Sequence, residues 1–564
     1  MKKKWISYEK DYKKSIELVE EMGLPAIFGP LLYNRNIETV EEGNHYLFGK
    51  YEDIGDSYLL KDMTEAVDRI VKAIEISESI VIYGDYDVDG TVSTSLLYSV
   101  IKSLGGNVDY YIPNRFEEGY GLNAEAVEML SNRGTKLIVT VDCGISSVDT
   151  VDFANSLGLN MVITDHHQCG EILPKATAIV NPHRIDCKSA FKDLAGCGVA
   201  LKLAKALGER LGKSGIEKKY LDLAAIGTVA DVVPLTGENR IIVKEGLSQI
   251  RSSENIGIQA MLTVCELLNK PINSFTIGFI IGPRMNAAGR LDSALEVVKL
   301  LTTEDKEEAM KVAKKLDCDN KERQKIEKDI LEKAIEVIEK NGMAENGRVL
   351  VVDGEGWHSG VIGIVASRLV EKYYLPTLII SRSGEEAKGS ARSLSGFNLF
   401  EALSKIPECF EKFGGHEMAA GFSLKSNKIQ ELREKLNMVA EEVTDGKPFI
   451  PEIRVDYKLS AQELSRMTHD KLKLLEPYGM KNPAPVFVCR KMKVLSFKKI
   501  GVDGKHLSLN VFDGEKSVSG IAFQMGELFD QLKINCEIDL LCSLEINSWN
   551  GFDKLQLNIK DIKF

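Results

Sequence analysis

The sequence predicts an α/β protein with a doubly wound parallel-sheet domain, a long helix, a second α/β domain and a small C-terminal β-barrel. Three observations lead to this fold class. Short apolar runs alternate with longer amphipathic segments over residues 60–235, as in successive βαβ units. A highly charged stretch without Pro or Gly follows at 304–340. Near the C-terminus, apolar and polar residues alternate, which is typical of half-buried strands.

The first domain should contain a parallel sheet, because its apolar runs are short and end in Gly, Pro or Asp. Helical segments such as 92–103 and 124–131 lie between these runs, as parallel strands require. We assign this domain to residues 51–303, after an N-terminal segment at 1–50. The expected strands are 80–83, 108–112, 137–141 and 161–164.

The charged stretch predicts a long, solvent-exposed helix at 304–342 that joins two globular parts. Its single narrow apolar stripe recurs at i+4 spacing, and Asn341-Gly342 supplies a C-terminal stop. A second α/β domain is expected at 343–444. After a linker at 446–451, a β-barrel of the OB type completes the chain, within 445–564. The stripe consists of Ile326, Ile330, Ala334 and Ile338.

Composition limits the class of protein without fixing its function. With 564 residues, 44% hydrophobic and 27% charged, the chain resembles an ordinary globular protein of several domains. We expect a cytoplasmic protein, because no apolar run reaches the roughly 20 residues needed to span a membrane and no signal peptide is recognisable. The ten cysteines form no CxxC pair, which argues against a zinc ribbon. A net charge of −11 neither indicates nor excludes nucleic-acid binding.

The strongest chemical signal is the loop GDYDVDG at 84–90, directly after an expected strand. Asp85, Asp87 and Asp89 would repel one another unless cations neutralise them or water surrounds them. Carboxylates suit hard ions such as Mg²⁺ or Mn²⁺. An EF-hand is excluded, because Leu96 stands where its bidentate Glu belongs. A dinucleotide-binding loop is excluded because acids occupy positions that pyrophosphate needs uncharged.

Other expected strand ends carry similar groups. The run 137–141 is followed by Asp142, and the run 161–164 by Asp165, His166 and His167. In an open parallel sheet these ends meet at one edge, where ligands collect. Asp231 also emerges from an apolar segment, and a buried Asp needs a cation or an Arg partner. The pattern predicts a metal site.

These motifs together resemble the DHH phosphoesterase superfamily and, within it, the RecJ single-stranded-DNA exonucleases, over nearly the whole chain. The superfamily motifs are GDYDVDG, VDCG ending at Gly144, TDHH at 164–167 and GTVADVVPL at 227–235. More specific likenesses occur at 113–121, 282–290 and 357–363. Segments 389–393 and 413–416 resemble the DHH-associated domain, and 475–479 the OB region of these enzymes.

The resemblance implies two divalent ions, Mn²⁺ or Mg²⁺, ligated by Asp87, Asp89, Asp142, His166 and Asp231. It also implies catalytic roles for His167, Asp142 and Asp165, in which Asp165 orients the ring of His166 and His167 faces the scissile phosphate. Asp85 is either an outer group of the site or a loop cap. Tyr83 stands where related pyrophosphatases carry a ligating His, so one ion is expected to bind more weakly.

The same resemblance implies a metal-dependent 5′→3′ exonuclease specific for single-stranded DNA, acting in repair and recombination. It assigns the terminal phosphate or nearby backbone to Arg115, Arg284, Arg290, Ser390, Arg392 and His416. Arginine suits this role because its planar fork binds phosphate bidentately. A surface ion pair is the competing interpretation for each arginine. His358 has no comparable loop context and is interpreted as structural.

Expected partners are single-stranded DNA, a single-stranded-DNA-binding protein and a helicase, with no membrane and with a monomeric chain. Two alternatives remain open at this stage. One is a DHH phosphodiesterase acting on short oligonucleotides or cyclic dinucleotides, although such enzymes lack the OB-like tail. The other is a non-catalytic replication scaffold, whose mark would be loss of the acidic residues; here the acidic set is complete.

Overall fold

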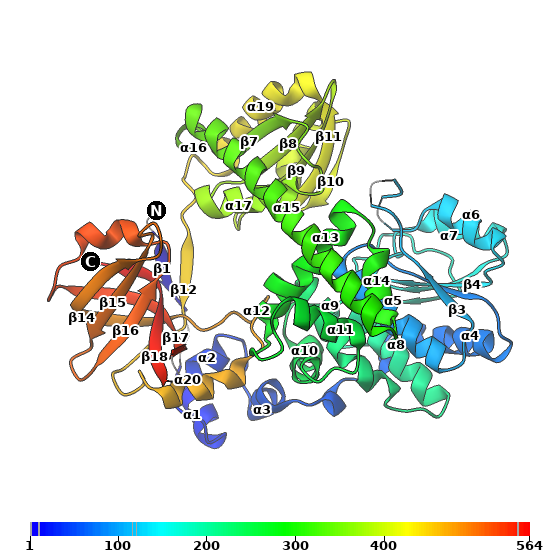
Figure 1. Cartoon of the computed structure of the whole chain (residues 1–564), viewed down its shortest axis with the longest axis horizontal. Helices are drawn as coiled ribbons and strands as arrows, with labels where there is room; N and C mark the ends of the chain where they lie inside the picture. The colour runs from blue at the N-terminus through cyan, green and yellow to red at the C-terminus, as the bar shows by residue number, and fades with distance from the viewer. Residues whose placement is uncertain (1–2, 9–11, 116, 120, 550–551) are drawn as a thin grey trace. The chain divides into compact units, whose positions relative to one another are not determined.

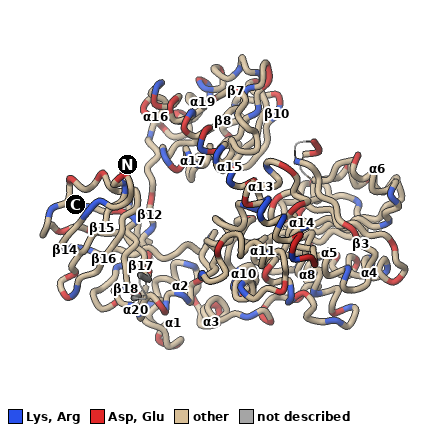
Figure 2. Tube along the Cα trace, viewed as in Figure 1, with Lys and Arg blue, Asp and Glu red and all other residues tan. Residues whose placement is uncertain are grey.

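The computed structural model describes residues 3–8, 12–115, 117–119, 121–549 and 552–564. The chain divides into two compact units, which are described separately. The larger unit comprises Lys3–Gly282, Val297–Lys306 and Glu452–Phe564, and the smaller unit comprises Pro283–Glu296 and Glu307–Pro451. Among the described residues, no helix is both long and apolar enough to cross a membrane. Figure 2 shows basic and acidic residues interspersed along the chain.

A five-stranded parallel sheet forms the centre of the larger unit, in the order β3-β2-β4-β5-β6 (Figure 1). After β2 the chain adds β3 on one side and then returns to place β4 on the other, which makes the sheet doubly wound as predicted. The position between β2 and β4, at the carboxyl ends of the strands, is therefore a topological switch point. The strands are β2 (Ile80–Tyr83), β3 (Val108–Tyr111), β4 (Leu137–Val141), β5 (Asn160–Thr164) and β6 (Ala178–Val180).

The residues of β2 and β4 are buried along their whole length, so continuous apolar runs replace the alternation of a half-exposed sheet. Helix α5 begins at Val88, four residues before the predicted start, because Asp87 caps it. The helices around and after this sheet are α4 (Met63–Glu75), α5 (Val88–Ser103), α6 (Ala124–Asn132), α7 (Val148–Ser156), α8 (Gly196–Arg210), α9 (Leu221–Ala230), α10 (Gly237–Ile250), α11 (Ile256–Val264) and α14 (Leu295–Thr302).

The C-terminal barrel closes because β14 pairs with both β15 and β17. Its strands follow the order β13-β14-β15-β16-β18-β17, and apolar side chains alternate into one core. A short helix, α20 (Arg466–Leu472), precedes the long strands. The strands are β13 (Tyr457–Lys458), β14 (Phe487–Ile500), β15 (His506–Phe512), β16 (Ser517–Ala522), β17 (Glu537–Trp549) and β18 (Phe552–Lys563).

The N-terminal segment packs with this barrel, an arrangement that the sequence does not predict. Strand β1 (Lys4–Ser7) pairs in parallel with β12 (Glu452–Val455), at the start of the C-terminal part. Phe28 and Leu31 share a hydrophobic core with Leu507 and Leu540 of the barrel. The first and last parts of the chain therefore fold together. The helices of the segment are α1 (Lys13–Glu21), α2 (Phe28–Tyr33) and α3 (Val40–Phe48).

The smaller unit is built on a mixed sheet in the order β10-β11-β9-β8-β7, with only β7 and β8 parallel. One face packs on α18 (Leu399–Ser404) and α19 (Ile429–Val443). The other face packs on α17 (Ile362–Tyr373) and on the long helix. The strands are β7 (Leu350–Glu355), β8 (Thr377–Ser383), β9 (Glu386–Arg392), β10 (Lys412–His416) and β11 (Ala419–Lys425).

The long helix, α15, runs from Lys306 to Lys340 and is followed by Gly342 in a left-handed conformation, as predicted. The long helix is confirmed, but its description as solvent-exposed is wrong for the face that carries the stripe. Ile330, Ala334 and Ile338 are buried against β7 and α17. The i+4 stripe is therefore the face by which α15 joins the core of the smaller unit, because an apolar stripe gains stability only when another element covers it.

Candidate metal centre and phosphate-binding residues

The acidic loop after β2 is held by the N-termini of two helices. Asp87 caps α5, and its side chain accepts the backbone N–H of Gly90 at 3.0 Å. Asp89 is buried, and its two oxygens accept the N–H groups of Gly196 (2.7 Å) and Cys197 (2.9 Å) at the start of α8. Because helix N-termini carry positive partial charge, both carboxylates are fixed in position by backbone donors.

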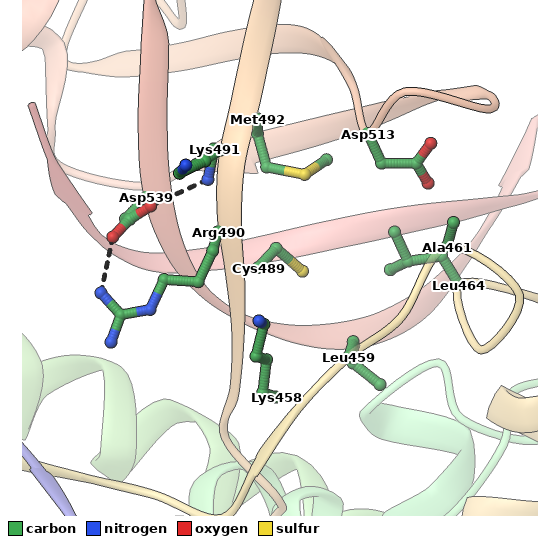
Figure 3. A pocket seen from close by; sticks show the side chains of 10 residues that line it. All are labelled: Lys458, Leu459, Ala461, Leu464, Cys489, Arg490, Lys491, Met492, Asp513 and Asp539. Atoms are coloured by element: carbon green, nitrogen blue, oxygen red, sulfur yellow. Dashed lines mark hydrogen bonds and ion pairs between the residues drawn. The ribbon is translucent and has the colours of Figure 1, made fainter.

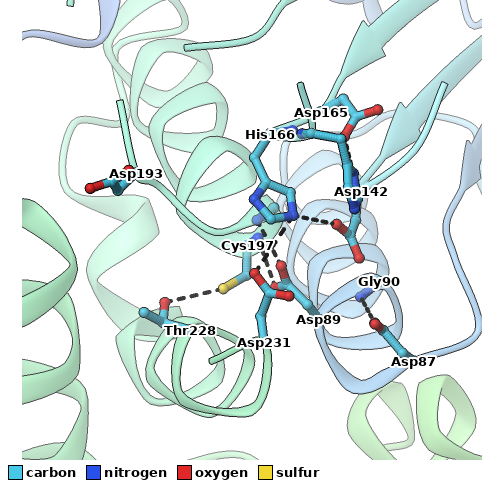
Figure 4. Close-up of polar contacts among 12 residues, drawn as sticks. Asp87, Asp89, Gly90, Asp142, Asp165, His166, Asp193, Cys197, Thr228 and Asp231 are labelled. Carbon is cyan, nitrogen blue, oxygen red and sulfur yellow. Dashed lines mark hydrogen bonds and ion pairs between the residues drawn. The ribbon is translucent and has the colours of Figure 1, made fainter. Parts of the chain in front are cut away.

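The ends of β4 and β5 bring Asp142 and His166 together, because Val141 and Thr164 are neighbours in the sheet. Nε2 of His166 lies 3.1 Å from Oδ1 of Asp142 and 3.6 Å from Oδ2 of Asp231. Asp231 follows the last residue of α9. Figure 4 shows Asp89, Asp142 and Asp231 directed toward the His166 ring. Ligand atoms of Asp89, His166 and Asp231 all lie within 4.8 Å of one another.

The backbone at this cluster adopts uncommon conformations. Asp142 has φ 59° and Val232, directly after Asp231, has φ 63°. A β-branched residue in the left-handed region is a genuine outlier, and such conformations cost on the order of 1–3 kcal/mol each. Their occurrence beside two acidic side chains is typical of a functional site, where the surrounding structure enforces the strain.

Two glycines make room for the carboxylates. A Cβ atom on Gly196 would lie 2.8 Å from Oδ1 of Asp142, and a Cβ atom on Gly227 would lie 2.7 Å from Oδ1 of Asp89. Gly196, Cys197 and Gly227 are not among the residues that the sequence predicts for the site. The available signal was Gly-Cys-Gly at 196–198 at the start of an apolar helix, a pattern that permits close approach of backbone to another group.

Burial and mutual repulsion oppose ionisation of these carboxyl groups. Burial, followed by the charges of Asp89 and Asp87, raises the pKa of Asp231 to about 8. Burial and the charge of Asp89 also raise the pKa values of Asp87 and Asp142 above the ordinary range. Burial lowers the pKa of His166 and so favours the neutral imidazole that ligates metals.

The residues fit a site for divalent cations. Oδ2 of Asp231 and Nε2 of His166 are buried and accept or donate no hydrogen bond within the described part of the chain. Such atoms are costly unless an ion or another partner satisfies them. Carboxylate oxygens with one imidazole are the donor set of Mn²⁺ and Mg²⁺ sites. A cation would also remove the repulsion that raises these pKa values.

Asp165 orients His167 and not the ring of His166, so the sequence expectation about Asp165 is wrong. Oδ1 of Asp165 lies 2.7 Å from Nδ1 of His167 and accepts the backbone N–H of His166 at 2.7 Å, while Oδ2 accepts the N–H of Ile145 at 2.9 Å. The ring of His166 instead faces Asp142 and Asp231. The side chain of His167 is 46% exposed against 11% for His166, so His167 is the histidine that a substrate can reach.

The same contact governs the charge of His167. Burial alone would lower its pKa, but the hydrogen bond and the negative charge of Asp165 outweigh burial and raise the pKa to about 9. Asp165 itself is buried, yet its pKa is lowered because the bond to His167 and the backbone N–H donors outweigh burial. The two residues therefore form an ion pair at the rim of the cluster.

Asp85 and Tyr83 occupy the surroundings of the cluster. Asp85 is buried, and burial together with the charge of Asp87 raises its pKa to about 7. The hydroxyl of Tyr83 donates to the carbonyl oxygen of Gly121 at 3.1 Å and lies 3.2 Å from Nδ2 of Asn123. Tyr83 thus packs in the core of the domain and holds the segment at 121–123. Its hydroxyl oxygen is engaged in these hydrogen bonds and does not act as a metal ligand.

The expected phosphate contacts fall in both units. In the larger unit, the Arg115 guanidinium lies 5.0 Å from the centre of the Tyr86 ring, in the acidic loop. In the smaller unit, Arg392 donates to Oγ of Ser390 at 3.1 Å. His416 is exposed at the end of β10, opposite Ala419, which is in turn paired with Arg392. The sheet therefore brings Ser390, Arg392 and His416 together.

The remaining candidates of the smaller unit have intramolecular partners. Arg284 forms an ion pair with Asp317 at 2.9 Å, and Arg290 donates to the carbonyl oxygen of Gly360 at 2.9 Å. Nδ1 of His358 accepts the N–H of Gly360 at 3.1 Å, in keeping with its structural interpretation. Arg290 and His358 thus stabilise the same turn before α17.

A hollow of about 530 Å³ lies on the barrel (Figure 3). Its wall carries Lys458, Arg490 and Lys491, but also Asp513 and Asp539. Arg490 pairs with Asp539 at 2.6 Å, and the same carboxylate accepts the N–H of Lys491 at 2.9 Å. Because its charges are mixed and partly paired, this hollow is less suited to an anion than an unpaired basic surface.

Comparisons with known proteins agree with this geometry. Residues 79–228 match the DHH family, N-terminal domain, residues 346–442 match the DHHA1 domain, and residues 455–561 match the RecJ OB domain. The single-stranded-DNA-specific exonuclease RecJ of Bacillus subtilis strain 168 is 40% identical over 562 residues, which cover 99% of this chain and 71% of that protein.

Two crystal structures of RecJ from Thermus thermophilus are also similar. The structure in complex with Mn²⁺ has a TM-score of 0.84 at 28% identity and covers 100% of this chain and 79% of that chain. The structure in complex with Mg²⁺ has a TM-score of 0.78 at 27% identity, covering 100% of this chain and 78% of that one. The similarity therefore extends over all the domains described above.

Proposed function

The chain belongs to the RecJ family of single-stranded-DNA-specific exonucleases within the DHH phosphoesterases, and we propose that it degrades single-stranded DNA from the 5′ end with two divalent ions. The observation that carries the proposal is the convergence of Asp89, Asp142, His166 and Asp231 on one point at the switch of the parallel sheet. Asp87 completes the set from the cap of α5.

Five side chains of the larger unit would hold the ions, namely Asp87, Asp89, Asp142, His166 and Asp231. Asp142 follows β4, the strand between β2 and β5, so its carboxylate would be available to ions from a position between the acidic loop and His166. Asp89, His166 and Asp231 would contribute ligand atoms that lie within 4.8 Å of one another, and Asp87 would add a carboxylate from the cap of α5. When bound, Mn²⁺ or Mg²⁺ lowers the pKa of a coordinated water and neutralises charge on the phosphodiester. The orphaned Oδ2 of Asp231 and Nε2 of His166 support this assignment.

His167 is assigned to the phosphate itself. Asp165 fixes its Nδ1 atom at 2.7 Å, which directs the opposite nitrogen, Nε2, away from Asp165. From that position Nε2 can donate a hydrogen bond to a phosphate oxygen or to the leaving 3′ oxygen. A positioned side chain of this kind contributes on the order of 10²–10⁴-fold to a rate.

The basic residues would hold the end of the strand. Arg115 stands beside the acidic loop, while Arg392, Ser390 and His416 share one face of a sheet. An arginine fork and a serine hydroxyl suit the oxygens of a terminal 5′ phosphate. We assign Arg284 and Arg290 to supporting phosphate contacts, in which phosphate would compete with their present partners, Asp317 and Gly360.

We further propose that a helicase and a single-stranded-DNA-binding protein supply the substrate, since an enzyme confined to single strands requires the duplex to be opened first. A monomer suffices for this activity, because all assigned metal ligands come from one chain. The barrel would extend the contact with the strand, in the manner of other OB domains.

End-labelled DNA tests the function. Single strands labelled at the 5′ or the 3′ end, a duplex of the same sequence and a dinucleotide are incubated with Mn²⁺, Mg²⁺ or EDTA. We expect early release of the 5′ label from the single strand, with either metal and not with EDTA. Initial release of the 3′ label would refute the direction alone. Preference for the dinucleotide would indicate the oligonucleotide phosphodiesterase, and binding without cleavage under every metal would indicate the scaffold.

A further inference from the structure

A small hollow of about 190 Å³ lies in the larger unit, where three parts of the chain meet. These parts are the N-terminal segment, the start of α10 and the turn at 479–482, which precedes β14 of the barrel. The hollow is smaller than the roughly 300–1,000 Å³ of sites for drug-sized ligands, so it suits an ion or a very small molecule. Its polar lining includes Arg35, Glu42, Thr236, Arg240 and Lys481.

Arg240 brings a buried positive charge to the wall of this hollow. It is 2% exposed, and its guanidinium group lies 4.0 Å from the centre of the Tyr46 ring. The guanidinium donates to the carbonyl oxygens of Tyr46 at 2.8 Å and of Leu474 and Leu475 at 2.9 Å. None of the carboxylates that the structure describes forms an ion pair with it; Glu476 lies nearby, and burial raises the pKa of that carboxyl group. Because a buried charge is normally paired with an opposite charge, the charge of Arg240 is left uncompensated.

Two further cations close to Arg240 also have neutral partners. Arg35 donates to two carbonyl oxygens and, at 2.9 Å, to Oδ1 of Asn482. Lys244, one turn further along α10, donates to the carbonyl oxygen of Leu47 at 3.0 Å. Burial lowers the pKa of Arg240, and the positive charge of Arg35 acts in the same direction. Burial and the charge of Arg240 likewise lower the pKa of Lys244. Positive charges therefore repel one another at this junction.

The acids near the hollow do not neutralise these charges. Glu42 is the one acid among the lining residues, and its carboxylate accepts the N–H groups of Glu38 at 2.9 Å and of Thr39 at 3.1 Å in the capping box of α3. Lys481 lies 3.8 Å from Asp193, but its side chain is 60% exposed, and such surface pairs are weak. The lining therefore keeps an excess of positive charge, which attracts an anion.

The start of α10 adds to this attraction. The helix begins at Gly237, and its N-cap residue, Thr236, makes no side-chain hydrogen bond to the first turn. N–H groups at such an end carry positive partial charge. Because Thr236 and Gly237 line the same hollow as Arg35 and Arg240, the end of the helix and the two guanidinium groups surround one space.

We propose that this hollow binds a small oxyanion, inorganic phosphate, which neutralises Arg35 and Arg240 and joins the N-terminal segment, α10 and the barrel. A phosphate ion suits the site because guanidinium groups bind its oxygens through charge-assisted hydrogen bonds and helix N-termini bind anions. None of the residues assigned above to the metal ions or to the DNA lines the hollow. The bound ion stabilises the folded chain and takes no part in cleavage.

Thermal unfolding of the full chain tests the proposal. Melting temperatures are measured in EDTA, with inorganic phosphate replacing chloride at constant ionic strength, for wild type, Thr236→Asp and Thr236→Asn. An ion that binds only the folded chain stabilises it by RT ln(1 + [ion]/Kd), so the melting temperature of wild type should rise with phosphate. The carboxylate of Thr236→Asp should take the place of the ion. We expect this variant to melt at a higher temperature than wild type without phosphate, and to bind phosphate at least about tenfold more weakly, which corresponds to about 1.4 kcal/mol.

Thr236→Asn is the matched control, because Asn caps a helix about as well as Asp but carries no charge. It should keep the phosphate-dependent rise of wild type. Phosphate bound near the metal cluster would act alike on all three proteins, so an equal rise in all three would overturn the proposal, as would no rise in wild type.

A parallel series with a nucleoside 5′-monophosphate distinguishes the sources of the phosphate group. Because the hollow is small, we expect the nucleotide to stabilise wild type less than inorganic phosphate does. Stabilisation by the nucleotide alone would overturn the assignment of the site to inorganic phosphate.

Discussion

Nδ1 of His167 lies 2.7 Å from Oδ1 of Asp165, and this buried carboxylate also accepts backbone N–H groups from Ile145 and His166. The pair therefore connects the turn after β4 with the turn after β5. His167 is held at the rim of the metal cluster by a residue that does not face the cluster centre. Such a group is suited to contact substrate while its neighbour His166 contacts metal.

The first prediction separates these two histidines. In His167→Ala we expect kcat to fall by about 10²–10⁴-fold, the usual range for loss of a positioned proton donor, while Mn²⁺ affinity stays near wild type. In His166→Ala, Mn²⁺ affinity itself should fall, because Nε2 faces Asp142 and Asp231. Calorimetric titration with Mn²⁺ and single-turnover cleavage measure the two effects. His45→Ala, an exposed histidine of α3, is the control. An equal loss of Mn²⁺ affinity in both histidine variants would contradict the assignment.

The second prediction concerns Asp142. Its carboxyl group is buried among other acids, and burial together with their charges raises its pKa. Near neutral pH this carboxyl group should therefore lower the stability of the metal-free protein. In Asp142→Asn we expect no cleavage, an equal or higher melting temperature in EDTA, and no further rise with Mn²⁺. In wild type, Mn²⁺ at 100 times its dissociation constant should add about 2.7 kcal/mol. Scanning calorimetry with and without Mn²⁺ provides the comparison. A metal-dependent rise in the variant equal to that of wild type would argue against Asp142 as a ligand.

Residues close in sequence could be assigned from the sequence, whereas contacts between distant residues could not. The strand-end rule identifies Asp142, His166 and the loop at 84–90, because each begins within two residues after the end of an apolar run. The donors to Asp89 lie 107 and 108 residues further along the chain, and their role depends on how α8 is placed. The conformation of the turn after β5 decides whether Asp165 contacts the ring of His166 or that of His167. A sequence pattern does not specify that conformation.

The same limit explains the differences in the fold. The apolar stripe on α15, which includes Ile330, Ala334 and Ile338, can be recognised in the sequence. The pattern does not predict which surface covers the stripe. β7 and α17 supply that surface. The packing of Phe28 with the barrel likewise joins residues from opposite ends of the chain. Periodicity predicts which face of an element is buried, and tertiary structure decides its partner.

The third prediction tests the space around Asp89 without removing a ligand. A Cβ atom on Gly227 would lie 2.6 Å from Sγ of Cys197 and 2.7 Å from Oδ1 of Asp89. Gly227→Ala should therefore displace the carboxylate of Asp89 and lower both Mn²⁺ affinity and kcat. If the displacement costs about 1.4 kcal/mol of binding free energy, Mn²⁺ affinity falls about tenfold. Gly278→Ala is the control, since the nearest atom to its Cβ is 3.8 Å away. Metal titration should distinguish the two variants; identical affinities would show that Asp89 tolerates the intrusion.

The fourth prediction treats α15 as part of the smaller unit's core. Ile330 is 2% exposed and packs with Leu350 and Val365, so Ile330→Ala removes buried methylene and methyl groups and leaves a cavity. Substitutions of this kind cost about 2–5 kcal/mol. We expect lower stability in urea, together with earlier protease cleavage within 307–451. Lys328→Ala, whose side chain is 76% exposed on the same helix, should change stability by less than about 0.5 kcal/mol. Because an exposed connector would tolerate both substitutions equally, a difference between them establishes that the stripe is a packing surface.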